Sequence, residues 1–245
     1  MSVERTTEKE VRAQPTVNNE NVLPLKHGER LTREEFERRY ETMPYLKKAE
    51  LIEGVVYMPS PVRIDFHGRP HAQIMAWLGA YWIATPGVDL ADNSTVYLDS
   101  NNEHQPDALL RIEPAQGGRS RIIEEGYVEG APELIVEIAG TSADYDLQEK
   151  LEVYRRCGVQ EYIVWQTQEE QLDWFQLVNE EYVALAPNAE GIIESQIFPG
   201  LRLAVAALLA GDRAEVSLEL QTGLQTTDHT TFVERLAKTH QDLPD

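Results

Sequence analysis

The chain of 245 residues has little cysteine and, over most of its length, little lysine. The single cysteine, Cys157, excludes a disulfide framework and a zinc site built from cysteines. No run of about 18 uncharged apolar residues occurs, so the sequence predicts no transmembrane helix. The N-terminal residues are polar and charged, unlike a secretory signal. We therefore expect a soluble, cytoplasmic protein.

Short motifs with a known chemistry are also missing. The sequence contains no GxxxxGK[ST], no GxGxxG after a strand, no HExxH and no GxSxG. Among six histidines, His67 and His71 stand four residues apart. Because the acid of an HExxH motif is absent there, we favour packing or capping roles for them over a zinc site.

Positive charge is scarce in the middle of the chain. Residues 1–50 carry ten acids and ten bases, whereas residues 51–200 carry 25 acids and 8 bases and so supply 17 of the 20 net negative charges. Binding to DNA through counterion release needs clustered lysine and arginine, so we expect weak nonspecific DNA binding. A small basic rim could still form from Arg111, Arg119, Arg121, Arg155 and Arg156.

Hydrophobic patterns predict an α/β protein. Residues 133–139 (ELIVEIA) form a nearly continuous apolar run, as expected of a central strand buried on both faces. A helix and a further strand at 160–165 follow, which makes a right-handed βαβ unit. Other strands, including residues 107–112, come before it. We expect a central mixed β-sheet flanked by helices.

The chain divides into three parts by composition. Residues 1–28 are polar without periodicity and are expected to be a flexible arm. Residues 29–212 are expected to form one domain, and residues 213–245 a C-terminal extension with an amphipathic helix.

One lysine lies on the apolar side of the helix expected at 146–157. At about 100° per residue, Leu151 and Tyr154 lie on one face, and Lys150 falls within the same arc. No other lysine occurs in residues 49–237. This position requires an explanation, because a lysine on a buried face needs polar partners.

Two carboxylates lie where such a lysine could reach them. Asp107 opens a strand after Pro106, and Glu137 lies inside an apolar strand, where a charge is costly unless it is paired or bound to metal. With Lys150 these are the parts of a Mg²⁺-dependent phosphodiester hydrolase. Structural alternatives remain open: a turn at Asp107, a salt bridge or edge position for Glu137, and a plain ion pair with Lys150.

Four segments together resemble a known family. They are ELIEGVVYMPSP, QPDALL, APELIVEIAGTSADYDLQEKLEVYRRCGVQEYIVW and IFPGLRL, within residues 31–210 or so. They resemble the Uma2 family (formerly DUF820) of the PD-(D/E)xK, restriction-endonuclease-like superfamily. The resemblance implies a restriction-endonuclease-like α/β core and an endonuclease that depends on Mg²⁺ or Mn²⁺.

The resemblance also implies roles for single residues. Asp107 corresponds to the aspartate of the PD motif and Glu137 to the acid of the (D/E)xK half-motif. Ala139 stands where the motif has its lysine, and the resemblance implies that Lys150 on the following helix takes that function.

The remaining metal ligands follow from the same resemblance. Glu53 would be an upstream acid that binds the metal through water, and the backbone carbonyl of Ile138 a further ligand. Thr141 and Ser142 occupy a serine/threonine turn that is expected to cap the helix.

Three functions are compatible with this pattern. The first is a Mg²⁺-dependent endonuclease acting on DNA, expected from the superfamily to be a homodimer with one site for each strand. The second is a non-catalytic or regulatory module that keeps the nuclease fold and binds a protein through its acidic surface. The third is a metal-dependent hydrolase of a smaller phosphate ester.

Overall fold

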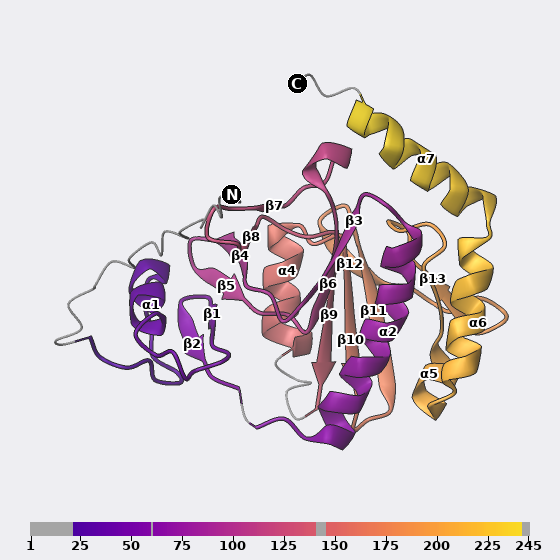
Figure 1. Cartoon of the computed structure of the whole chain (residues 1–245). Coiled ribbons are helices and arrows are strands. Elements are labelled where there is room, and N and C mark those ends of the chain that lie inside the picture. Colours follow the sequence, from indigo (N-terminus) through magenta and orange to yellow (C-terminus); the bar gives the residue numbers. More distant parts are fainter. Residues whose placement is uncertain (1–21, 60, 141–145, 242–245) are drawn as a thin grey trace, which may run out of the picture.

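The chain folds into two six-stranded sheets, a two-stranded hairpin and helices packed against them, as seen in the residues that this computed structural model describes, 22–59, 61–140 and 146–241 (Figure 1). The first half contains α1 (Arg33–Tyr40), β1 (Glu50–Ile52), β2 (Val55–Tyr57), η1 (Ile64–Gly68), α2 (Arg69–Ala84), β3 (Val88–Asp92), β4 (Val96–Asp99), β5 (Asn102–His104), β6 (Ala108–Ile112), η2 (Pro114–Gln116), β7 (Arg121–Ile122) and β8 (Val128–Glu129). The second half contains β9 (Leu134–Ala139), η3 (Asp146–Lys150), α4 (Leu151–Cys157), β10 (Glu161–Gln166), β11 (Gln171–Val178), β12 (Glu181–Ala184), β13 (Ile192–Glu194), β14 (Arg202–Ala204), α5 (Val205–Ala210), α6 (Arg213–Leu224) and α7 (Thr227–Gln241).

The main sheet has the strand order β12-β11-β10-β9-β6-β3. Strands β9 and β10 pair in parallel, while the other neighbours pair antiparallel. Every residue of β9 and β10 is buried, because these strands lie in the middle of the sheet and are covered on both faces. The predicted parallel strand pair joined by a helix, and the mixed sheet flanked by helices, are therefore confirmed.

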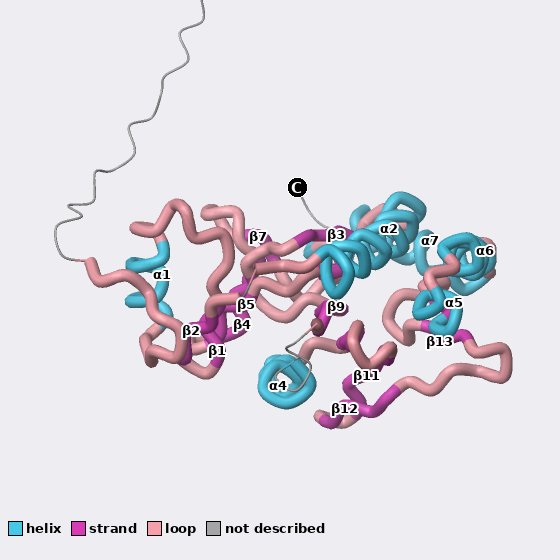
Figure 2. Tube along the Cα trace, turned by 90° about the horizontal axis from the view of Figure 1, so that it is seen from below, coloured by secondary structure: helices cyan, strands magenta, loops and turns pink. Residues whose placement is uncertain are grey.

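The two faces of β9 carry different chemistry because side chains alternate along a strand. Val136 and Ile138 belong to the apolar core beneath α2, α5, α6 and α7. Ile135 and Ala139 belong to the core beneath α4. Figure 2 shows α2 and α4 on opposite sides of the sheet. Glu137 has the parity of the α4 side, so its carboxylate points toward that helix.

The second sheet has the order β2-β1-β5-β4-β8-β7 and lies beside the main sheet (Figure 1). Its strand β1 pairs antiparallel with β2 and β5. The side chains of Ala49 and Leu51 enter a small core with Phe36 of α1. This core holds the segment that enters β1 and so determines where its alternate residues point.

The helix after β9 begins with a wider π-type turn, η3, and continues as α4. It ends at Gly158, whose left-handed φ of 86° is typical of a glycine C-cap. Lys150, the last residue of η3, is 3% exposed, so its predicted inward orientation is confirmed. Thr141 and Ser142, predicted to cap this helix, lie outside the described residues.

The C-terminal residues pack onto the main domain. Val216 and Leu220 of α6, with Phe232 and Leu236 of α7, join the same apolar core as Trp77 of α2. The segment predicted as an extension beyond residue 212 therefore completes the core on this side of the sheet. Within the described residues, no helix combines the length and apolarity needed to cross a membrane.

The predicted N-terminal arm falls mostly in residues 1–21, which lie outside the described residues. Its last part is packed. Leu25 is 4% exposed, and the amide of Gly28 donates to the carbonyl of Val56 at 2.8 Å. Residues 25–28 therefore belong to the domain.

Candidate active site

Two carboxylates face each other at the end of the β6–β9 pair. The antiparallel register sets Ala108 opposite Val136, so continuing it by one residue sets Asp107 opposite Glu137. Both residues are 3% exposed. Like charges directly opposite each other on neighbouring strands repel, so this pair needs nearby cations or hydrogen-bond donors.

The backbone of β9 holds one oxygen of Asp107. The amide of Ile138 donates to Asp107 Oδ2 at 2.8 Å. In an antiparallel ladder a residue directs its N–H and C=O toward the same neighbour. The carbonyl of Ile138 therefore points to the side where Asp107 lies, as the predicted ligand role requires.

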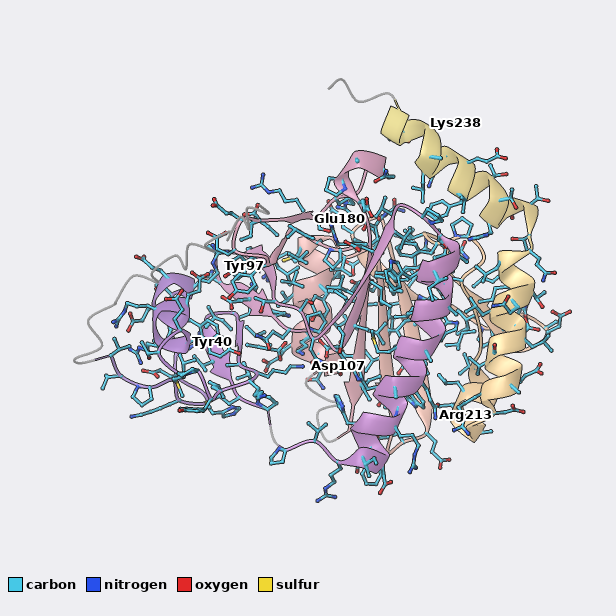
Figure 3. All side chains as sticks on the ribbon, viewed as in Figure 1. Tyr40, Tyr97, Asp107, Glu180, Arg213 and Lys238 are labelled. Carbon is cyan, nitrogen blue, oxygen red and sulfur yellow. The ribbon has the colours of Figure 1, made fainter. Side chains whose placement is uncertain are left out.

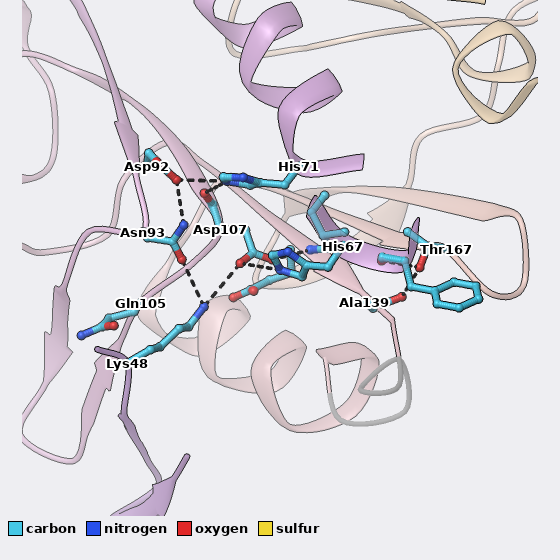
Figure 4. A network of polar contacts seen from close by, with 12 residues as sticks. Lys48, His67, His71, Asp92, Asn93, Gln105, Asp107, Ala139 and Thr167 are labelled. Atoms are coloured by element: carbon cyan, nitrogen blue, oxygen red, sulfur yellow. Dashed lines mark hydrogen bonds and ion pairs between the residues drawn. The ribbon is translucent and has the colours of Figure 1, made fainter. Parts of the chain in front are cut away.

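The other oxygen of Asp107 has two cationic or protonatable neighbours. Lys48 Nζ lies 3.3 Å and His67 Nε2 lies 3.1 Å from Oδ1 (Figure 4). Burial alone raises the pKa of Asp107, but the His67 hydrogen bond and the Lys48 charge outweigh it and lower this pKa well below its usual range. Asp107 is therefore ionised at neutral pH.

Glu137 is held from the α4 side. Lys150 Nζ lies 2.8 Å from Glu137 Oε1, and the Tyr154 hydroxyl donates to the same oxygen at 3.0 Å. Tyr154 is fully buried, and its ring lies 5.1 Å from that of His104. Burial lowers the pKa of His104 to about 3, so this imidazole is neutral and adds no charge to the site.

A third buried carboxylate, Glu50, completes the group. Lys150 Nζ lies 3.1 Å from Glu50 Oε2, and the amide of Gln105 donates to Oε1 at 2.8 Å. Burial favours a raised pKa, but Lys150 and then Lys48 lower the pKa of Glu50 below its ordinary value. Glu50 is therefore ionised as well.

Lys48 remains charged at this site. Burial tends to lower its pKa, but Glu50, Asp107 and Glu137 together raise it above the ordinary value. Its ammonium also donates to Asn93 Oδ1 at 3.5 Å, a long hydrogen bond.

His67 and His71 both contact Asp107. His71 Nε2 lies 2.9 Å from the Asp107 carbonyl oxygen and 3.0 Å from Asp92 Oδ1. The two rings stack with their centroids 5.7 Å apart (Figure 4). His67 lies in η1 and His71 about one turn later in α2, and both contact Asp107, the residue directly before β6.

Glu53 is placed away from this group. It lies in the turn between β1 and β2 with a left-handed φ of 51°. Its Oε1 accepts from Arg156 at 2.5 Å and from the amide of Asn102 at 3.1 Å. Its side chain is 52% exposed. The acid that the structure brings to Lys150 is Glu50, three residues earlier.

Each arginine of the predicted basic rim has a partner within the protein. Arg111 is buried and donates to the Ser120 carbonyl, while Arg119 donates to the Gly158 carbonyl. The other three are paired with acids: Arg121 with Glu129, Arg155 with Glu152, and Arg156 with Glu53.

Four of the predicted residues converge at one end of the main sheet: Asp107, Glu137, Ile138 and Lys150. Asp107 is labelled at this end in Figure 3. In the described part of the chain, no three side chains of the His, Cys, Asp and Glu types form a group that could hold a metal ion. Lys48 and Glu50 were not predicted. Their spacing of two in KKAEL was the available signal, since alternate residues of an extended segment share a face.

Comparison with known proteins agrees with the predicted family and fold. The family model Uma2, described as "Putative restriction endonuclease", matches residues 33–206. A search of curated proteins found no match to this chain. The fold is similar to a solved structure titled "Crystal structure of a putative nuclease belonging to DUF820 from Anabaena variabilis ATCC 29413", with 16% identity and a TM-score of 0.54 over 74% of this chain and 98% of that one. The α/β core thus has the restriction-endonuclease-like fold, and the chain belongs to the Uma2 family.

Proposed function

We propose that this protein is an endonuclease that uses Mg²⁺ or Mn²⁺ to hydrolyse phosphodiester bonds of DNA. One observation carries the proposal. Asp107 and Glu137 are opposed across the β6–β9 pair, and the backbone of the same strand holds Asp107 through the amide of Ile138. Two buried carboxylates at one strand end are costly to a fold, and such a pair of oxygen donors is suited to bind a divalent cation.

The donor set suits a hard divalent cation. Mg²⁺ prefers oxygen ligands, keeps several waters and needs only one or two carboxylates besides its substrate. Asp107, Glu137 and the Ile138 carbonyl would hold it. A preformed group of three acidic or imidazole ligands is therefore not required. When bound, the metal supplies Lewis acidity and charge neutralisation for attack of water on the phosphodiester.

The protein's own residues prepare these ligands. The amide of Ile138 fixes the direction of the Asp107 carboxylate at 2.8 Å. Lys150 and Tyr154 both hold Glu137 Oε1, at 2.8 and 3.0 Å, which orients that buried carboxylate. The contact between Glu50 and Lys150 at 3.1 Å supports giving Glu50 the role that the family resemblance assigned to Glu53, that of an acid binding the metal through water.

Cleavage of DNA under controlled metal supply tests the proposal. Supercoiled plasmid is incubated with the protein and Mg²⁺ or Mn²⁺, and in parallel with EDTA. We expect nicking or linearisation only with the metals. Asp107→Asn keeps an oxygen that accepts from Ile138, and Glu137→Gln keeps the side-chain volume, so both variants should fold. Each should lose activity at least a hundredfold.

The matched control is Glu124→Gln, which removes one charge from an exposed loop residue. It should cleave like the unchanged protein. Metal-dependent cleavage that survives both Asp107→Asn and Glu137→Gln would refute the site. Calorimetric titration with Mn²⁺ is the independent readout, since the two site variants should also lose binding of the ion.

A non-catalytic module that binds a protein is the second candidate. It is favoured by the fact that Lys48 and Lys150 already give Asp107, Glu137 and Glu50 cationic partners. It also accounts for the excess of acids in residues 51–200. Such a module should show no DNA affinity even at low salt, where electrostatic contacts are strongest.

A homodimer is part of the endonuclease proposal, because a double-strand cut needs two sites. Light scattering coupled to size-exclusion chromatography measures the mass in solution. A monomer that nicks only one strand would support a single-site enzyme.

A further inference from the structure

Lysine is scarce in this protein, yet two lysines approach the candidate active site from different elements. Lys150 comes from η3 and Lys48 from the segment that enters β1. They differ in their access to solvent. The side chain of Lys48 is 22% exposed and that of Lys150 is 4% exposed.

Lys150 is enclosed by the protein. Its ammonium contacts Glu137 at 2.8 Å and Glu50 at 3.1 Å, and both acids are buried. A substrate phosphate could reach this ammonium only by breaking a buried ion pair, which is costly. Lys150 is thus a positioning residue, which orients Glu137 from beneath.

Lys48 is directed at the site by the alternation of its own segment. Ala49 packs into the small core with Phe36, so its neighbours Lys48 and Glu50 point the other way, toward Asp107. The preceding lysine, Lys47, is exposed instead. Packing of Ala49 in the small core fixes the backbone at Lys48, so that its side chain starts from a defined position and extends toward the carboxylates.

The ammonium of Lys48 retains capacity for a ligand. It has three N–H donors, and its contacts within the described residues are Asp107 Oδ1 at 3.3 Å and Asn93 Oδ1 at 3.5 Å. Both distances are long for charged hydrogen bonds. Figure 4 shows the lysine extended between Asn93 and Asp107, with His67 on the other side of the carboxylate.

An anionic substrate needs a cation on the open side of this acidic site. The arginines proposed for a rim are engaged elsewhere, and Lys150 is enclosed. We propose that Lys48 is the residue that binds the scissile phosphodiester, so that the lysine contacting substrate comes from the segment before β1 and not from the helix after β9. This inference rests on the proposed function, because it assumes a phosphodiester substrate.

The salt dependence of DNA binding tests this assignment. A fluorescein-labelled duplex of mixed sequence is titrated with the full-length protein in a constant concentration of Ca²⁺, over a series of KCl concentrations, and gels check that the DNA stays intact. Removing one lysine–phosphate contact lowers the slope of log K against log salt by about 0.9. Raising the salt concentration from 50 to 200 mM lowers the binding constant by some factor in the unchanged protein. For Lys48→Met we expect that factor to be roughly 3.5 times smaller.

Two further variants separate phosphate binding from a structural role. Lys48→Arg keeps the charge and should restore the slope. Lys238→Met removes a lysine from the exposed end of α7, far from Asp107 in Figure 3, and should keep the original slope.

Each outcome is informative. Binding by the unchanged protein with the same slope in Lys48→Met refutes the role of Lys48 alone and leaves the nuclease proposal standing. A slope that falls in Lys238→Met as much as in Lys48→Met also refutes it. No binding by the unchanged protein at any salt concentration refutes both the DNA substrate and the contact by Lys48.

Discussion

Replacing Lys150 by methionine tests how the buried charges are balanced. Methionine keeps an unbranched side chain of similar length but removes the ammonium. In the unchanged protein this group lies 2.8 Å from Glu137 and 3.1 Å from Glu50. The substitution therefore leaves two buried carboxylates without their shared cation.

The size of the effect follows from burial. The side chains of Lys150 and Glu137 are each 4% exposed, and that of Glu50 is 8% exposed, so water cannot replace the lost ammonium. Removing one partner of a buried ion pair costs about 3–5 kcal/mol in the free energy of unfolding. In a protein of this size, that corresponds to a melting temperature lower by about 6–20 °C.

The loss should depend on pH in a defined direction. The pKa of Glu50 is held below its ordinary value, against the effect of burial, by Lys150 and then by Lys48. An acid with a lowered pKa stabilises the fold above its unfolded pKa, and this contribution disappears as the pH falls. The gap in stability between the unchanged protein and Lys150→Met should therefore be fully present above about pH 4.3 and shrink as the pH falls below that value.

Urea unfolding followed by tryptophan fluorescence measures both effects. The free energy of unfolding is compared for the unchanged protein, Lys150→Met and the double variant Lys150→Met/Glu137→Gln, at pH values from about 3 to 8. The double variant should regain part of the loss, because one uncompensated charge is gone. A loss below about 1 kcal/mol at pH 7, typical of an exposed pair, would refute this account of Lys150.

Three other predictions follow from buried or paired groups. Burial raises the pKa of Glu103 to about 8, so the folded protein keeps a proton on this side chain and loses stability as the pH rises from about 5 to about 8. In urea unfolding, Glu103→Gln should flatten this decline in stability, and an unchanged decline would contradict the assignment. Burial raises the pKa of Cys157 to about 12, so its reaction with Ellman's reagent at pH 8 should be at least about tenfold slower in the folded protein than in urea, and equal rates would refute it. Glu50→Gln should weaken Mn²⁺ binding about tenfold while Glu53→Gln leaves it within about twofold, and the reverse order would restore Glu53 as the upstream acid.

The strand-borne part of the site could be predicted from the sequence. Glu137 interrupts an apolar run, and a buried charge in a strand demands a partner. Asp107 directly precedes β6, the strand that pairs with β9. Lys150 was recognisable because helical periodicity placed it on a buried face, and it does contact Glu137 at 2.8 Å. Local periodicity was sufficient in these cases, since each residue's direction is determined by its own element.

The positions of Lys48 and Glu50 in the site could not be predicted, because they depend on the second sheet. Glu50 and Glu53 are three positions apart in ELIEG, and from the sequence either could serve as the additional acid. The two acids point in different directions because Glu53 lies in the tight turn of the β1–β2 hairpin, where its side chain contacts Arg156. Lys48 depends in the same way on the docking of β1 against α1, a contact between elements that local patterns do not encode.

The formal charges of the site give a physical reason for a divalent cation. Three carboxylates, Asp107, Glu137 and Glu50, face two ammonium groups, Lys48 and Lys150, which leaves one net negative charge. A phosphodiester carries one negative charge and would be repelled from this group. A divalent cation held by Asp107 and Glu137 would change the sum to one positive charge, which a phosphodiester would neutralise. Such a cation would compete with Lys48 for Asp107, and a Lys48 ammonium released from that carboxylate would be free to bind a substrate phosphate.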